Sequence, residues 1–211
     1  MENQAAPGSQ MILGIETAIG SGSLALYVGE EVIDFAGPVA RSETLLPSIQ
    51  ALLSDSNCRP EAIQKIAVCL GPGSFTGIRI GIATAVGLAS GLGIECVGIS
   101  AQDAVESDED LAQGYSVVPL GRDQFSIRHF EGGTQPQPQG PEIKSSSELM
   151  EIMLEHPEDK FLIPLESAEM LPTDLPNLVV CARSTAGKLC RLAATGYGSS
   201  ELIPNYLRRE I

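Results

Sequence analysis

The stretch Leu70–Gly91 reads Leu-Gly-Pro-Gly-Ser-Phe-Thr-Gly-Ile-Arg-Ile-Gly-Ile-Ala-Thr-Ala-Val-Gly-Leu-Ala-Ser-Gly. It follows an apolar run, passes through closely spaced glycines and continues with apolar residues at helical spacing, which predicts a strand, a tight loop and a helix. Ser74 or Thr76 is placed to cap that helix. Bare N–H groups at a helix N-terminus favour an anion. However, the lysine of a P-loop is missing, so a structural turn and a phosphate site both stay open.

Small residues recur at every fourth position of the predicted helix and form one row: Gly77, Gly81, Ala85 and Ala89. A row of larger apolar residues runs beside it: Phe75, Ile78, Ile82 and Val86. The helix is therefore apolar over a wider arc than a single core-facing stripe requires. Two interpretations follow from this width: a helix buried in its own domain, or a helix that packs on another subunit.

The composition bounds the class of protein. The 211 residues are 43% hydrophobic, which is ample for a core, and only 4% are aromatic. No uninterrupted apolar run of about 18 residues occurs and residues 1–10 are polar, so neither a membrane span nor a secretory signal is predicted. Five cysteines without Cys-x-x-Cys spacing are typical of a reducing compartment. We expect a cytoplasmic protein with a disordered tail at residues 1–10.

The charge argues against a free-standing nucleic-acid binder. The formal net charge is −14, and residues 1–121 hold 4 Lys and Arg against 14 Asp and Glu, whereas residues 122–211 hold 9 against 13. Such a surface repels a phosphate backbone. We therefore expect any contact with RNA to be made through a more basic partner.

The order of predicted elements indicates an α/β protein. Strands at 11–17, 23–28 and 31–36 predict an antiparallel meander. The rest of the first half alternates between a helix at 42–53, a strand at 65–70, the long helix, a strand at 95–99 and a helix at 100–110. After residue 113 we expect a hairpin at 116–120 and 124–130, a linker at 131–141, helices at 145–155 and 182–195, and short strands at 160–164 and 177–180.

Glu16 and Thr17 end the first predicted strand and precede a glycine-rich turn. Actin-like ATPases place an acidic residue and a hydroxyl at such a loop, near Mg²⁺ and phosphate, but a strand-end carboxylate also caps its own turn. Both interpretations stay open, and the weak candidates for a cofactor site are Glu16, Thr17, Gly71, Gly73 and Ser74. His129 and His156 have no second histidine at helical spacing, so we expect structural or solvated side chains and no metal site.

Four segments together resemble the TsaB (YeaZ) family in order and spacing. They are 12–17, 42–49, the block 71–81 (Gly-Pro-Gly-Ser-Phe-Thr-Gly-Ile-Arg-Ile-Gly) and 97–100. The tail 204–208 is similar to the family's closing motif, while residues 120–122 read Leu-Gly-Arg where the family usually has Asp-Ala-Arg. The resemblance implies an actin-like (ASKHA) fold with two related lobes, each with a mixed sheet and packed helices. Residues 11–112 would form the first lobe and residues 113–211 a divergent second lobe.

The resemblance also implies a function in tRNA modification. Members of the family act in bacterial synthesis of threonylcarbamoyladenosine at position 37 of tRNAs that read codons starting with A. The implied role is that of a non-catalytic subunit that pairs with and activates a TsaD-type transferase, with a TsaE-type ATPase in the complex. Alone, the chain would form a homodimer. It would bind tRNA only through the complex and hold no cofactor of its own, with ATP or ADP at the junction of the complex.

The transferase carries a His-x-x-x-His metal motif after the strand that corresponds to 95–99, where this chain has Ser-Ala-Gln-Asp-Ala at 100–104. The resemblance therefore implies no catalytic and no metal-binding residue here. The residues alone leave an alternative: a small actin-like phosphotransferase or ATPase that uses Glu16 and the glycine loop.

We expect the partner contact on the helices at 42–53 and 75–91, which similar proteins join into a pseudo-symmetric four-helix bundle. The residues predicted for this interface are Leu45, Leu46, Ile49, Leu53, Phe75, Gly77, Ile78, Gly81, Ile82, Ala85 and Ala89.

Overall fold

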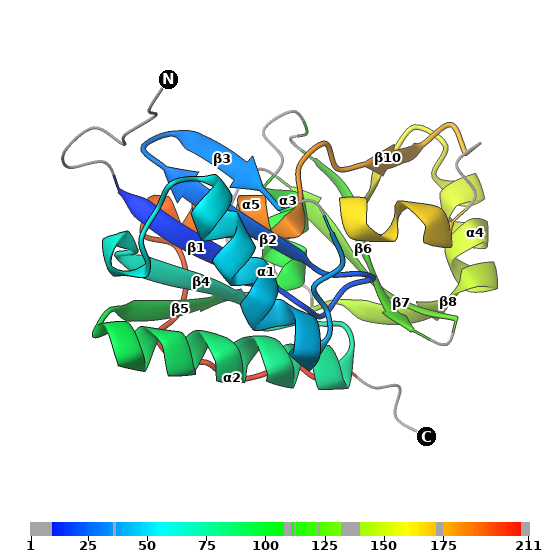
Figure 1. Ribbon diagram of the computed structural model, residues 1–211. Coiled ribbons are helices and arrows are strands. Elements are labelled where there is room, and N and C mark those ends of the chain that lie inside the picture. Colours follow the sequence, from blue (N-terminus) through cyan, green and yellow to red (C-terminus); the bar gives the residue numbers. More distant parts are fainter. Residues whose placement is uncertain are drawn as a thin grey trace.

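The structure is a computed structural model that describes residues 10–35, 37–107, 111, 113–121, 123–131, 140–171 and 175–207. Two five-stranded sheets stand side by side, each covered by helices (Figure 1). The disordered tail predicted at residues 1–10 lies outside the described residues except for Gln10.

The first sheet, sheet A, is built from residues 11–99. Its strands are β1 (Met11–Glu16), β2 (Ser23–Val28), β3 (Glu31–Asp34), β4 (Lys65–Cys69) and β5 (Glu95–Ile99), in the order β3-β2-β1-β4-β5. The predicted meander is confirmed, because β1 pairs antiparallel with β2, and β2 with β3. β4 pairs parallel with β1, and β5 with β4. The central strand β1 is buried along its whole length, which explains its nearly continuous apolar sequence.

The second sheet, sheet B, repeats this topology. Its strands are β6 (Gln113–Gly121), β7 (Gln124–Glu131), β8 (Glu142–Ser145), β9 (Phe161–Ile163) and β10 (Leu178–Val180), in the order β10-β9-β6-β7-β8. β6 occupies the place of β1: it pairs antiparallel with β7 and parallel with β9. The chain therefore has the two related lobes of an actin-like α/β fold. The edge strand β8 was not predicted.

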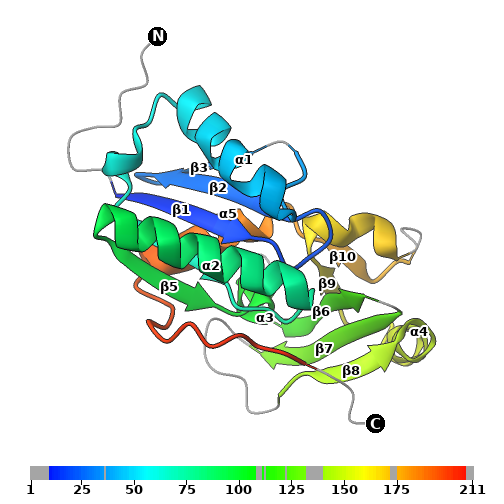
Figure 2. The same ribbon diagram turned by 60° about the horizontal axis from the view of Figure 1, so that its bottom comes forward.

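The helices differ between the two lobes. α1 (Ser42–Asp55) and α2 (Phe75–Leu92) lie next to each other on the outer face of sheet A (Figure 2), and α4 (Ser146–Glu155) covers sheet B on its outer side. α2 connects β4 to β5, whereas the described part of the corresponding connection from β9 to β10 holds the 3₁₀ helix η2 (Leu165–Met170). A second 3₁₀ helix, η1 (Pro60–Ala62), precedes β4. Among the residues that the structure describes, a long helix in this connection is thus found in the first lobe alone.

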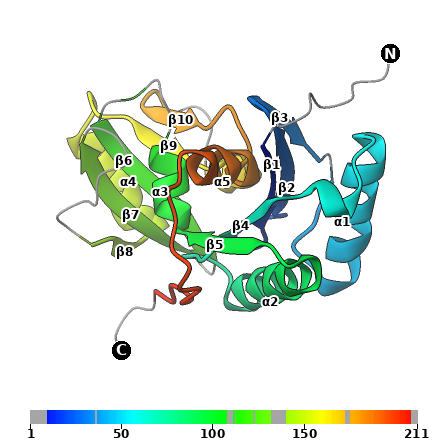
Figure 3. The same ribbon diagram turned by 90° about the vertical axis from the view of Figure 1, so that its left-hand side faces the viewer.

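Two helices fill the space between the sheets (Figure 3): α3 (Ala101–Glu106) and α5 (Thr185–Ala194). α5 lies in the segment 113–211 that we expected to form the second lobe, yet it packs on β1, β2 and β4 of sheet A. The contact is close because β1 has a glycine there: a Cβ on Gly14 would lie 2.7 Å from the sulfur of Cys190. The C-terminal part of the chain therefore returns to the first lobe.

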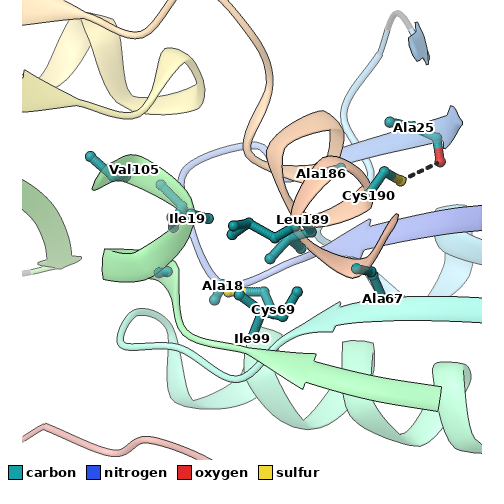
Figure 4. Close-up of a cluster of buried hydrophobic side chains, with 14 of the residues drawn as sticks. Ala18, Ile19, Ala25, Ala67, Cys69, Ile99, Val105, Ala186, Leu189 and Cys190 are labelled. Atoms are coloured by element: carbon teal, nitrogen blue, oxygen red, sulfur yellow. Dashed lines mark hydrogen bonds between the residues drawn. The ribbon is translucent and has the colours of Figure 1, made fainter. Parts of the chain in front are cut away.

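A buried apolar cluster surrounds α5 (Figure 4). Leu189 of α5 lies among Ile19, Ala67 and Ile99 of the first lobe, and the Cys190 thiol donates to the Ala25 carbonyl oxygen at 3.8 Å. The same cluster includes side chains of sheet B, such as Val118, Phe130 and Leu162. One core thus joins the two lobes.

A buried ion cluster reinforces this junction. Arg128 on β7 donates from Nε to Glu106 Oε1 at 2.8 Å, and from Nη2 to Glu106 Oε2 at 2.7 Å and Asp103 Oδ1 at 2.6 Å. The Ser116 hydroxyl donates to Glu106 Oε1 at 2.6 Å. Burial raises the pKa of Glu106, and the bonds from Arg128 and Ser116 oppose that rise. The cluster ties α3 to sheet B.

Candidate functional site

The Glu16 carboxylate is buried and caps its own turn. Its Oε1 accepts hydrogen bonds from the backbone N–H groups of Ala18 and Ile19, the latter at 2.8 Å. Among the described residues, Oε2 has no hydrogen-bond partner. Burial, and next the charge of Glu166, raise the pKa of Glu16 well above its usual value, against the effect of the two N–H groups. Of the two interpretations from the sequence, the contacts favour the carboxylate that caps a strand end.

The loop after β1 packs directly on the glycine loop. The Thr17 hydroxyl donates to the carbonyl oxygen of Gly77 at 2.7 Å, and the Ser74 N–H donates to the Ala18 carbonyl oxygen at 2.7 Å. A Cβ on Gly73 would lie 2.5 Å from that same oxygen, and one on Gly77 would overlap the Thr17 carbonyl. The glycines therefore serve the close approach of two backbones.

Two further polar groups of the glycine loop are also engaged, the Ser74 hydroxyl and the Gly71 carbonyl. Ser74 is the N-cap of α2, and its hydroxyl accepts from the Gly77 N–H at 3.2 Å. The Gly71 carbonyl accepts from the Ala101 N–H at 2.7 Å. A Cβ on Gly71 would lie 2.6 Å from Ile78 Cδ1 and 2.9 Å from the Asn205 carbonyl oxygen. The structure thus brings the five candidate cofactor residues together, but as a packed junction between β1, β4 and α2.

The predicted interface residues divide into two groups. Eight of them are buried inside the first lobe: Leu45, Ile49, Leu53, Gly77, Ile78, Gly81, Ala85 and Ala89. Ile82 is half-buried against the core, and only Leu46 and Phe75 are exposed, at 50% and 38%. The row of small residues therefore packs on the lobe's own sheet, and its assignment to the partner contact is corrected. The helical spacing of these residues is as predicted. However, the sequence of an almost wholly apolar helix does not show which of its sides faces the core.

The outward face of α2 carries different residues: Thr76, Arg79, Ala83, Val86, Gly87 and Ser90. Val86 is 45% exposed, and a Cβ on Gly87 would meet no described atom within 4 Å. Together with Leu46 on α1 this side of α2 forms the outer helix face. Of its members only Leu46 was predicted for the interface. The others were missed because their signal, apolar and small residues opposite the buried row, is visible only once the buried row is known.

α2 is the one described helix that is long and apolar enough to cross a membrane by length and composition. Its neighbours favour a different role. β4 and β5, at its two ends, pair in parallel along the same sheet, with Lys65 opposite Glu95 and Cys69 opposite Ile99. A helix that connects such strands runs back along the sheet and packs on it. We therefore interpret α2 as a helix that packs on sheet A and carries further apolar residues on its outer side.

The two histidines flank one aromatic ring on the outer face of sheet B. The Tyr115 ring stacks on Phe161 at 4.7 Å, and the rings of His129 and His156 lie 4.9 and 5.6 Å from it. His156 Nδ1 lies 3.2 Å from Asp159 Oδ2. In the part of the chain that the structure describes, no group of three or more His, Cys, Asp or Glu is arranged to hold a metal ion.

The sequence is similar to known proteins mainly in its first lobe. The model of the family TsaD: tRNA N6-adenosine threonylcarbamoyltransferase matches residues 39–120. A tRNA threonylcarbamoyladenosine biosynthesis protein TsaB from Escherichia coli (strain K12) is 40% identical over 91 residues, 42% of this chain and 39% of the relative. Its namesake from Bacillus subtilis (strain 168) is 32% identical over 128 residues, 59% of this chain and 48% of the relative. The matches thus span less than half the length of these relatives.

Two solved structures from Pseudomonas aeruginosa share the fold over nearly the whole chain. YeaZ superposes with a TM-score of 0.64 at 18% identity, and a protein described as similar to peptidase YEAZ superposes with a TM-score of 0.67 at 21% identity. Each alignment covers 94% of this chain and 100% of the other. At such identities the likeness concerns the fold, while the sequence matches concern the first lobe. Taken together, the chain is similar in the sequence of its first lobe to proteins named TsaB, and in its fold, over nearly its whole length, to YeaZ.

Proposed function

We propose that this chain acts in the synthesis of threonylcarbamoyladenosine on tRNA as a non-catalytic subunit that pairs with a TsaD-type transferase and activates it. The observation that carries the proposal is the outer helix face. It exposes Leu46 and Val86 on two adjacent helices of the segment 39–120, which also matches the transferase family. Two subunits that share such a helix pair can join face to face around a pseudo-twofold axis.

The composition of the outer helix face suits a tight helix contact. Ala83, Gly87 and Ser90 lie along the exposed side of α2, so a second helix can approach closely there. Val86 on the same helix and Leu46 on α1 supply exposed apolar area. Exposed apolar surface of this kind marks interaction sites in soluble proteins. The contact would therefore involve the side of α2 opposite the row first predicted.

The transfer chemistry is assigned to the partner because the equivalent positions of this chain have other tasks. Ser100 caps α3, and its hydroxyl accepts from the Asp103 N–H at 3.0 Å. Ala104, at the place of the second histidine, is fully buried and has an apolar side chain. Neither side chain is a usual ligand for a catalytic metal ion. The ATPase alternative receives less support, because the Glu16 loop is packed on the glycine loop.

The test is binding between the purified chain and a TsaD-type subunit, measured by calorimetry and by size exclusion, with tRNA modification by the mixture as a second readout. Val86→Glu puts a charge into the outer helix face and is expected to weaken binding at least about tenfold. Leu154→Glu is the matched control, because Leu154 is 73% exposed on α4 of the other lobe. Absence of a complex with the unaltered chain refutes the proposal. Equal binding by the two variants refutes the assigned face.

A further inference from the structure

The C-terminal strap, residues 199–207, follows α5 in the chain and runs from the edge strand β5 of sheet A to the start of α2 (Figure 2). Ser199 and Gly98 exchange two backbone hydrogen bonds, of 2.8 and 3.0 Å, so the strap begins on the edge strand β5. Further along, the Asn205 N–H donates to the Leu70 carbonyl oxygen at 2.7 Å, beside the glycine loop. The strap is thus held at two separate points of the first lobe.

The strap ends in an aromatic and cationic cluster on α2. The Tyr206 ring lies 4.7 Å from the Phe75 ring, and Arg79 Nε donates to the Tyr206 hydroxyl at 3.0 Å. The Arg79 guanidinium carbon lies 3.8 Å from the centre of the Phe75 ring, a cation–π contact. We call these three side chains the strap anchor. Phe75 and Tyr206 each remain 38% exposed, so the cluster keeps an open side.

Tyr197, two positions before the strap, connects it to the junction of the lobes. The Tyr197 hydroxyl donates to Asp103 Oδ2 at 3.0 Å, and Asp103 also accepts from Arg128. Burial, and next the charge of Asp103, raise the pKa of Tyr197 to about 12, so its hydroxyl stays protonated and remains a donor at neutral pH. The strap is therefore fixed at its start and its end, and its position is defined before any partner binds.

A purely structural role accounts for only part of the strap. Its backbone bonds to Gly98 cover the edge of sheet A, which protects a parallel edge strand from pairing with other chains. That task needs no tyrosine with an exposed ring at the far end. Tyr and Arg side chains that are held rigid by neighbours dominate the energetics of protein interfaces. The strap anchor has this composition, and it borders the outward side of α2 opposite α1 (Figure 2).

We propose that the C-terminal strap is part of the surface that binds the TsaD-type subunit, and that Tyr206, with Arg79 and Phe75, is the anchor of that contact. The inference rests on the function proposed above and extends the outer helix face from two elements to three: α1, α2 and the strap. We assign the TsaD-type subunit as the partner of the strap anchor because the anchor adjoins the outer helix face: Phe75 and Arg79 belong to the helix that carries Val86. A subunit that packs along α2 reaches the strap anchor at the N-terminal end of that helix.

The experiment measures the affinity of the full chain for the TsaD-type subunit. Tyr206→Ala is expected to weaken binding at least about tenfold, and Arg79→Ala, which keeps the backbone bonds of the strap, by a similar factor. Tyr206→Phe retains the tilted ring contact with Phe75 but removes the acceptor for Arg79, so a smaller loss is expected. Ile203→Ala is the matched control on the same strap, because Ile203 is 67% exposed, and its affinity should stay within about twofold. Thermal melting of each free variant checks that the fold is intact.

The outcomes separate the two proposals. If Tyr206→Ala and Arg79→Ala bind as Ile203→Ala does while Val86→Glu loses binding, the role of the strap is overturned and the proposed pairing stands. If Val86→Glu also binds normally, the whole outer helix face is wrong. If the unaltered chain does not bind the TsaD-type subunit, the proposed function fails and the role of the strap fails with it.

Discussion

The Thr17 hydroxyl donates a 2.7 Å hydrogen bond to the Gly77 carbonyl oxygen, so the first turn of α2 rests directly on the loop after β1. A methyl group on Gly77 would overlap the carbonyl of Thr17, which is backbone and cannot rotate away. Gly77→Ala is therefore expected to lower the free energy of unfolding by about 1–3 kcal/mol or more, measured by urea denaturation.

The matched control is Gly87→Ala on the same helix. No described atom lies within 4 Å of the added methyl group, and alanine is a better helix former than glycine. This variant is expected to gain up to about 1 kcal/mol of unfolding free energy. Equal effects of the two substitutions would contradict this orientation of α2, since the row of small residues would then face solvent.

Glu16→Gln tests the buried carboxylate. Because the pKa of Glu16 is higher in the folded chain than in the unfolded chain, the folded chain keeps the Glu16 proton at pH values where the unfolded chain has lost it. The folded state therefore loses stability as pH rises from the unfolded pKa of Glu16 towards the folded one. The substituted glutamine side chain keeps an oxygen for the two backbone N–H groups and does not titrate. The difference in unfolding free energy, variant minus unaltered chain, should therefore grow as pH rises from about 4. Glu61→Gln, at an exposed carboxylate, controls for the loss of one charge; a flat difference curve for Glu16→Gln would contradict the raised pKa.

Arg128→Gln should be strongly destabilising. The side chains of Arg128 and Glu106 are only 14% and 6% exposed, and removing the cation leaves the Glu106 carboxylate buried with fewer donors. Breaking such a pair costs about 3–5 kcal/mol. The pKa of Glu106 should rise further without Arg128, so the variant should lose more stability at high pH than at low pH. Lys144→Gln breaks the more exposed pair with Glu142 and should cost about 0–1 kcal/mol; chemical denaturation at several pH values distinguishes the two.

The local sequence pattern of the first lobe was enough to predict its strands and helices, because apolar residues recur in each segment with the spacing of a strand or of a helix. β2 and β5 have the predicted limits, and α2 differs from its prediction by one residue at its end. The pattern could not show which side of α2 faces the core. The row that contains Gly77 and Gly81 predicts a partner contact because small residues permit close approach, but the element that approaches them is the chain's own Thr17 loop.

In the second half of the chain, long-range contacts decide what local sequence cannot. β8 is four residues long and gains its place by pairing with β7, where Ile143 lies opposite Ser126. α5 was predicted as a helix, but its return to sheet A depends on Gly14, which is 172 positions before Ala186. The strap anchor likewise joins Tyr206 to residues more than 120 positions away. Such pairings leave no periodic signal in the sequence.

The last prediction concerns tRNA, which the names of the similar proteins suggest as a direct ligand. Binding of tRNA is driven by counterion release to clustered cations, and a net charge of −14 opposes the approach of a polyanion. The local cationic pair Arg208 and Arg209 follows the strap in sequence and lies outside the described residues. We therefore expect no detectable binding of tRNA by the chain alone at physiological salt, and binding only once a basic partner is present.

A gel shift over a salt series, with and without the TsaD-type subunit, measures this. Arg208→Ala/Arg209→Ala should leave the free chain unchanged and weaken the complex by no more than the loss of one or two phosphate contacts, seen as a salt slope smaller by about 1–2. The prediction is wrong if the chain alone binds tRNA with micromolar affinity and the double substitution abolishes it. In that case the pair of arginines that follows the strap in sequence would outweigh the repulsion of the whole chain, and this segment would contact RNA directly.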